Sequence, residues 1–174
     1  MNIEPITKIL ECDDGSLPDI NFDFSGEECV SNAYQYIQNL SSQLVGSNSY
    51  YWSKSKQAEI PIIFGENPAL KLMEGEAESF HVVFGGIKST SGNRVPDLGV
   101  FILSSDYISL DYKMGKCWNA EAVIGLFEVM AAIESLSKNT IISHEGNIFE
   151  QACELISAYQ SWKKFNKAIK RMDF

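Results

Sequence analysis

The chain has 174 residues, a formal net charge of −9, and 45% hydrophobic residues against 21% charged ones. This length suits one domain with a sizeable core and is short for two domains, and the apolar share excludes an intrinsically disordered chain. An acidic chain repels phosphate backbones and anionic membranes, so neither nucleic acid nor a membrane is an expected partner. The same charge serves solubility and favours association with a basic protein.

The N-terminal region is predicted to form a β-hairpin. Residues 6–12 are a short strand candidate, residues 13–19 are rich in turn formers, and residues 20–24 alternate apolar and polar side chains. The first residues lack the basic stretch and apolar run of a signal peptide, and no apolar run reaches the ~20 residues of a membrane helix. The cysteines have no CxxC spacing. These features indicate a cytoplasmic protein with free thiols.

A helix is predicted over residues 26–45. Ser25 and Glu28 have the spacing of a capping box, in which each side chain reaches the other residue's backbone N–H. Apolar residues then recur every three or four positions, and Gly46 suits the left-handed residue that ends many helices.

The next segments are shorter. Residues 47–58 are polar and aromatic and are predicted to form a loop or an exposed extended segment. Residues 59–64 are a strand candidate that Pro61 confines to an edge or a strand start. Asn67 and Pro68 fit the start of a short helix that runs to about residue 73, and residues 81–87 are a further strand candidate.

The stretch 97–136 is predicted to organise the fold. Residues 100–103 and 107–112 indicate two antiparallel strands of a hairpin. Asn119 can then cap a helix that carries an apolar stripe, formed by Val123, Ile124, Phe127, Met130 and Ile133. Residues 140–142 indicate a short strand or a connector.

The last predicted element is a helix, with Asn147 and Glu150 as a candidate cap pair and a basic end. The whole pattern predicts a single α+β domain over residues 1–174. It would have two layers, a mostly antiparallel sheet flanked by about three main helices. The basic end, residues 163–174, is expected to fray.

No pattern in the chain indicates catalysis. His81 and His144 are the only histidines, and neither has the HxH or HxxxH spacing that places two imidazoles on one metal ion. The GxSxG, phosphate-loop and dinucleotide-binding motifs are missing. We therefore expect a protein that is not an enzyme, with no catalytic residue, metal site or cofactor.

Two surface features could bind a partner. The aromatic run Tyr50-Tyr51-Trp52 lies in a polar segment, and such side chains are enriched where interfaces bind most strongly, although the segment could equally fold back onto the core. Glu74, Glu76 and Glu78 form either a negative lip for a cationic partner or a solvated turn.

The chain resembles, as a class, the immunity proteins of bacterial polymorphic-toxin and contact-dependent inhibition systems. The resemblance lies in size, charge and layout, with local likenesses at Tyr51-Trp52 after the first long helix and at residues 96–99 before the central hairpin. It implies a cytoplasmic protein that neutralises a cognate, basic and nuclease-like toxin by occluding it. The residues expected to meet the toxin are Tyr51, Trp52, Glu74, Glu76, Glu78, Asp106 and Asp111.

Two other functions remain open at this point. One is a small-molecule-binding or hydrolytic domain whose pocket lies near Asp111, Tyr112 and Trp118. The other is a structural or phage-related subunit, which self-association would reveal. The identity of the toxin or ligand, the oligomeric state and the strand order cannot be predicted from these patterns.

Overall fold

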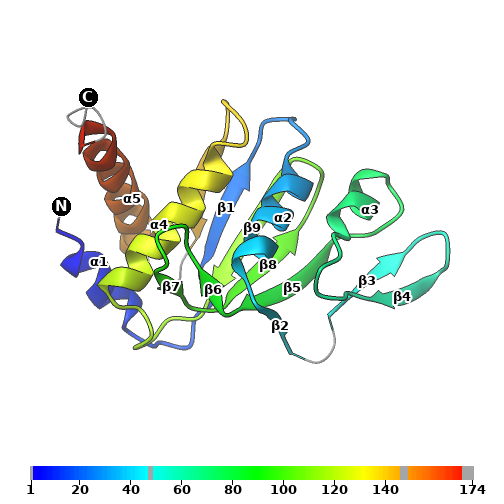
Figure 1. Ribbon diagram of the computed structural model, residues 1–174, viewed down its shortest axis with the longest axis horizontal. Coiled ribbons are helices and arrows are strands. Elements are labelled where there is room, and N and C mark those ends of the chain that lie inside the picture. The colour runs from blue at the N-terminus through cyan, green and yellow to red at the C-terminus, as the bar shows by residue number, and fades with distance from the viewer. Residues whose placement is uncertain (1, 47–48, 146–148, 170–174) are drawn as a thin grey trace.

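The computed structural model describes residues 2–46, 49–145 and 149–169 (Figure 1). Its helices are α1 (Glu4–Leu10), α2 (Val30–Leu40), α3 (Ala69–Met73), α4 (Ala120–Glu134) and α5 (Phe149–Ile169). Its strands are β1 (Asp19–Asp23), β2 (Gln43–Val45), β3 (Tyr50–Ser53), β4 (Ala58–Pro61), β5 (Phe80–Gly85), β6 (Ile87–Lys88), β7 (Arg94–Val95), β8 (Leu98–Ile102), β9 (Tyr107–Tyr112) and β10 (Ile141–Glu145).

Six of the strands form one sheet in the order β10-β1-β9-β8-β5-β2, and all neighbours in it are antiparallel. The central hairpin is confirmed, with Val100 of β8 opposite Leu110 of β9. Strands β3 and β4 form a separate hairpin that projects beyond the β2 edge of the sheet (Figure 1). The predicted α+β class with a mostly antiparallel sheet is confirmed.

The helices lie on one side of the six-stranded sheet (Figure 1). Side chains alternate between the two sides of a strand, so one set of strand residues faces the helices and is fully buried. It includes Ile20, Phe22, Val100, Leu110 and Tyr112. Burying one side chain of this size stabilises the fold by about 1.5–3 kcal/mol. The sheet is therefore held to the helix layer by a continuous apolar core.

Helix α4 forms as the sequence predicts. The Asn119 side-chain oxygen accepts a hydrogen bond from the backbone N–H of Ala122 (2.8 Å), which is the capping interaction expected at a helix start. Val123, Phe127, Met130 and Ile133 are fully buried in the core. Ile124, the fifth residue of the predicted stripe, is only partly buried, and Phe127 packs against Tyr159 and Trp162 of α5.

The predicted N-terminal hairpin is wrong. Residues 4–10 form helix α1, and Pro5 lies at its first turn, where the missing N–H of proline costs nothing. Ile6 and Leu10 are four residues apart and both are buried, a spacing that fits one helix face. Strand β1 pairs with β9 and β10 instead of with this segment.

The first long helix is shorter than predicted. Ser25 has a positive φ of 54°, and its hydroxyl donates to the carbonyl of Asn139, so it forms no capping box with Glu28. Helix α2 begins at Val30 and ends before Ser41, whose backbone is extended. Leu44 then pairs with Phe84 in the sheet, so Gly46 follows a strand and does not cap the helix.

The shorter segments follow the prediction in part. Residues 50–53 form the strand β3, which agrees with an exposed extended segment, and Pro61 ends the edge strand β4. Asn67 does not cap α3, because its side-chain amide donates to the Ser31 carbonyl (2.9 Å). Residues 141–145 form a full strand, β10, at one edge of the sheet.

Helix α5 runs to Ile169, so residues 163–169 of the basic end are helical. Lys163 forms an ion pair with Glu134 of α4, and Tyr159 donates a hydrogen bond to the same carboxylate (2.5 Å). Asn147 of the predicted cap pair and residues 170–174 lie outside the described residues. Among the described residues, no helix is long and apolar enough to cross a membrane.

Candidate functional site

The candidate site is the side of the six-stranded sheet that faces away from the helices, here called the open face. It carries the outward-pointing residues of the strands, at positions 141, 143 and 145 of β10, 19, 21 and 23 of β1, 107, 109 and 111 of β9, 99 and 101 of β8, 81, 83 and 85 of β5, and 43 and 45 of β2. None of these sixteen positions is a lysine or an arginine. The acids at these positions are Asp19, Asp23, Asp111 and Glu145, so the open face is negatively charged.

Three carboxylates lie side by side on the open face and are here called the acidic row. In the sheet register Asp19 is opposite Glu145 on one side and Asp111 on the other. Facing residues in an antiparallel pair have Cα atoms about 5 Å apart. The register thus forces these three acids into close proximity.

Each carboxylate of the acidic row has a polar neighbour on the same face. The Ser109 hydroxyl donates to Asp19 (3.2 Å), and the Asn21 amide donates to Glu145 (3.2 Å). Nε2 of His81 lies 2.7 Å from Oδ2 of Asp111, and because an ionised carboxylate only accepts, the ring nitrogen is the donor. These neighbours orient the carboxylates.

The two glycines on this face leave room for carboxylates. A Cβ at Gly99 would overlap the Asp111 carboxylate, which lies across the β8 backbone. A Cβ at Gly85 would lie 2.9 Å from Oδ1 of Asp97, which immediately precedes β8. Asp97 therefore lies on the same side of the sheet as the acidic row.

The acidic row is not neutralised by lysine or arginine within the described residues. The ion pairs there join other acids, and only Asp111 has a partner, His81. Partial burial raises the pKa of Asp19, and the charges of Asp111 and Glu145 raise it further, against the hydrogen bond from Ser109. The row is thus an electrostatically unfavourable arrangement that a cation would relieve.

An aromatic hollow adjoins the acidic row. It has a volume of about 370 Å³ and is lined by residues that include Trp52, Glu78, His81 and Phe101. The rings of His81 and Phe101 have centroids 4.4 Å apart and planes tilted by 30°. Phe101 is 39% exposed, and Leu103 just beyond β8 is 44% exposed. The hollow therefore offers apolar surface directly beside the carboxylates.

The structure brings four of the predicted partner-binding residues to this region. Trp52 and Glu78 line the aromatic hollow, and Asp111 belongs to the acidic row, connected to the hollow through His81. Tyr51 also borders the hollow, but its ring packs against Phe80 with centroids 6.3 Å apart. Within the aromatic run, Tyr51 therefore packs on the core, whereas Trp52 lines the hollow. Both arrangements were left open by the sequence.

The other predicted residues are engaged elsewhere. Lys71 pairs with both Glu74 (2.9 Å) and Glu76 (3.5 Å), and the Ser55 hydroxyl donates to Glu76. The hydrogen bond from Ser55, followed by the charge of Lys71, lowers the pKa of Glu76. Asp106 accepts from Ser104 (2.6 Å) in the turn between β8 and β9. These acids already have local partners.

The predicted pocket near Asp111 and Trp118 is wrong. Asp111 lies on the open face, and its neighbour Tyr112 points to the opposite, helix-covered side. Trp118 is fully buried there, edge-on to Tyr112, and its indole N–H donates to the Lys113 carbonyl (2.8 Å). The sheet therefore separates the two residues that this pocket required.

Sequence analysis missed Asp19, Glu145, Phe101 and the part played by His81. The alternation in residues 20–24 already places Asp19 and Asn21 on the polar side of a strand. It does not tell which strands lie beside β1, and that pairing is what assembles the acidic row.

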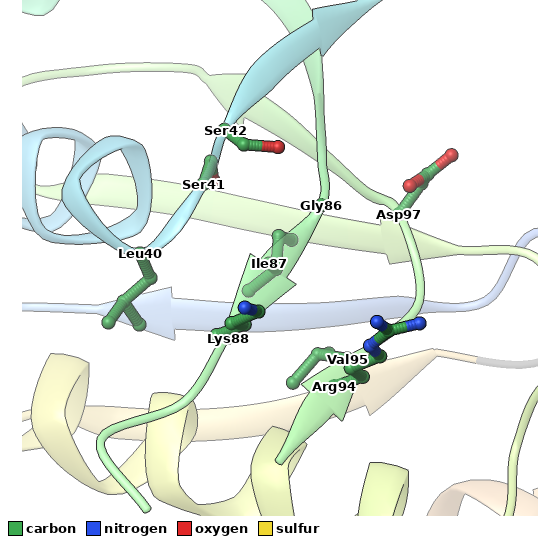
Figure 2. Close-up of a pocket in the computed structure, with 9 residues that line it drawn as sticks. All are labelled: Leu40, Ser41, Ser42, Gly86, Ile87, Lys88, Arg94, Val95 and Asp97. Carbon is green, nitrogen blue, oxygen red and sulfur yellow. The ribbon is translucent and has the colours of Figure 1, made fainter. Parts of the chain in front are cut away.

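A second hollow, of about 610 Å³, lies where α2 ends against β6 and β7 (Figure 2). Lys88 and Arg94 come to it from these two paired strands, beside Ser41 and Ser42. Figure 2 shows the Asp97 carboxylate pointing away from the Arg94 guanidinium. This hollow contains none of the predicted partner-binding residues. In the part of the chain that is described, no three His, Cys, Asp or Glu residues are arranged to hold a metal ion.

Comparison with known proteins assigns no family. No family model matches the chain, and no curated protein matches it. A matching solved structure is the 1.75 Å crystal structure of the toxic C-terminal tip of CdiA from Pseudomonas aeruginosa in complex with its immune protein. The identity is 12% and the TM-score 0.48, over 74% of this chain and 84% of the other. These values are too low to assign a function to this chain.

Proposed function

We propose that this protein is a cytoplasmic binding protein that neutralises a bacterial toxin domain with a basic surface. The observation that carries the proposal is the open face, where among the described residues the carboxylates of Asp19 and Glu145 have no basic partner and Asp111 connects the acidic row to an aromatic hollow through His81. The class resemblance to immunity proteins, which rests on size, charge and layout, supplies the toxin as the partner. The proposal includes no catalytic step.

Electrostatics supports a basic partner. The chain carries 23 acidic against 14 basic residues, and five of the basic ones lie in its last twelve positions. Potentials of this kind accelerate association with a partner of opposite charge, and the effect weakens as ionic strength rises. Neutralisation by occlusion requires only that bound protein cover the functional surface of the toxin.

The test is co-expression with the protein encoded immediately upstream of this chain's gene, first for growth and then for complex formation. We expect the upstream protein to arrest growth when expressed alone and not to arrest it when the two are expressed together. The purified pair should form a one-to-one complex whose dissociation constant rises with salt, by roughly tenfold or more between 50 and 500 mM.

The control is the upstream protein co-expressed with a variant of this chain that carries a stop codon after residue 60, which removes most of the sheet. This control must fail to protect. If the full chain also fails to protect and no complex forms at low salt, the toxin-neutralising function is excluded.

A further inference from the structure

We propose that the open face is the docking surface for a basic, partly apolar segment of a partner protein, with a cationic side chain lying on the acidic row and an apolar side chain in the aromatic hollow. This inference rests on the proposed function for the identity of the partner. The inference places the centre of the interface on the open face and not on Glu74, Glu76 and Glu78.

The first step in the argument is that no helix among the described residues covers this sheet face. The helices lie on the opposite side (Figure 1), and the open face places Asp19, Asp111 and Glu145 in adjacent strands. A sheet packed on a core through one face can leave its other face to solvent, but that face then normally mixes charges of both signs or neutral polar side chains. Here the outward positions of the strands include acids and no lysine or arginine.

The second step is that the acids on this face differ from the other predicted ones. Glu74 and Glu76 already pair with Lys71, so a partner cation there would displace an existing ion pair. Asp19 and Glu145 form no ion pair among the described residues and accept only neutral hydrogen bonds. A cation placed between Asp19 and Glu145 would therefore add attraction without breaking an ion pair.

The third step identifies the chemistry of the occupant. The acidic row is continuous with the hollow through the contact between His81 and Asp111 (2.7 Å), and His81 in turn lies against Phe101. In an extended segment, side chains two residues apart lie on the same side, about 6.6 Å from each other, so such a pair can reach the carboxylates and the apolar surface together. Arginine suits such a site, because its guanidinium pairs with carboxylates and also stacks on aromatic rings.

The test uses a synthetic hexapeptide with arginine at positions 1 and 5, leucine at position 3 and serine at the other positions, titrated into the ¹⁵N-labelled full-length protein, so that arginine and leucine share one side when the peptide is extended. A peptide with glutamate in place of arginine is the probe control. We expect amide shifts concentrated in β1, β5, β8, β9 and β10 with the arginine peptide and none with the glutamate peptide. Shifts concentrated at residues 71–78, or spread evenly over all acidic residues, would overturn the inference.

The variant is D19N/D111N/E145Q, which removes three charges from the open face and keeps the shape of each side chain. Its matched control is E27Q/E28Q/E121Q, which removes three charges from exposed residues near the starts of α2 and α4. The open-face variant should bind the peptide at least tenfold more weakly than the natural chain does, and the control variant within threefold of it. Equal losses in both variants would mean that only net charge matters, which contradicts the inference.

The same two variants separate this inference from the proposed function. If the upstream protein forms a complex that D19N/D111N/E145Q leaves unchanged, the inference is wrong and the toxin-neutralising function stands. If the arginine peptide binds the open face but the upstream protein neither arrests growth nor binds, the docking surface stands and its assignment to that toxin fails.

Discussion

Gly99 lies beneath the Asp111 carboxylate, and this arrangement explains how a carboxylate can lie flat on a sheet and reach His81. A Cβ at position 99 would overlap that carboxylate. We expect Gly99→Ala to push Asp111 away from His81 and to destabilise the protein by about 1–3 kcal/mol, as overpacking does. Urea denaturation would measure the change.

A double-mutant cycle provides the control for this prediction. In the background Asp111→Ala the obstacle is gone, so Gly99→Ala should become neutral or slightly stabilising, since alanine is favoured over glycine within a strand. An equal destabilisation in both backgrounds would show that position 99 is intolerant for a reason other than Asp111.

His144 gives a second prediction at the scale of a residue. Its ring lies on the helix-covered side, 2.8 Å from the Tyr112 hydroxyl, and burial lowers its pKa to about 4. The unfolded chain binds a proton near pH 6.5, so as the pH falls from about 6.5 towards 4 the unfolded state gains a proton that the folded state lacks. Stability should therefore fall over this range, by up to about 3 kcal/mol, and level off below it.

The measurement is the free energy of unfolding between pH 7 and pH 4.5 for the natural chain and for His144→Gln, which does not titrate and can still hydrogen-bond Tyr112. Other carboxylates titrate near the acid end in both proteins, so the quantity of interest is the difference between the two curves. Parallel curves would mean that His144 titrates normally in the folded protein.

At the scale of elements, α4 shows what a local signal can establish. Its cap depends on one side chain, because Asn119 accepts from Ala122 N–H at 2.8 Å. We expect Asn119→Ala to lower the free energy of unfolding by about 1 kcal/mol and Asn119→Asp to keep most of it. Thermal unfolding of the three proteins would check this, and equal losses in both variants would show that the cap itself contributes little.

The elements that the sequence predicts well are those whose stabilising contacts are local. The hairpin β8–β9 and helix α4 follow from alternation, a turn and a cap within 40 residues. Helix α1 was predicted as a strand because seven residues show too little periodicity to distinguish Ile6 and Leu10 on a helix face from an apolar strand. The capping box at Ser25 failed because a distant contact, with Asn139, determines that residue's conformation.

The candidate site depends on long-range pairing and was predictable only in part. Asp111 was identified from its strand, but Asp19 and Glu145 join it through pairings between segments far apart in the chain. Trp52 and Glu78 were identified as exposed groups. Their position beside His81 and Phe101 follows from where β3 crosses the end of β5, and no local pattern determines that position.

At the scale of the whole molecule, we expect the acids of the open face to favour binding of a basic partner and to lower the stability of the fold. The pKa of the Asp19 carboxyl is raised in the folded protein above its ordinary value of 3.8. At pH values between these two pKa values, the folded protein holds a proton that the unfolded chain has released. Stability therefore falls as the pH rises through that window, and the loss persists at neutral pH. Removing the charge of Asp19 should restore the stability that is lost at neutral pH.

We expect Asp19→Asn to raise the melting temperature at pH 7 by about 1–3 °C while weakening binding of the arginine peptide. Glu27→Gln, at an exposed position outside the open face, should change the melting temperature by less than about 1 °C. Because salt screens repulsion between partly exposed charges, the gain from Asp19→Asn should shrink as ionic strength rises. A lower melting temperature for Asp19→Asn would instead show that the Ser109 hydrogen bond outweighs both the cost of burying the Asp19 charge and its repulsion by Asp111 and Glu145. The acidic row would then stabilise the fold without needing a partner.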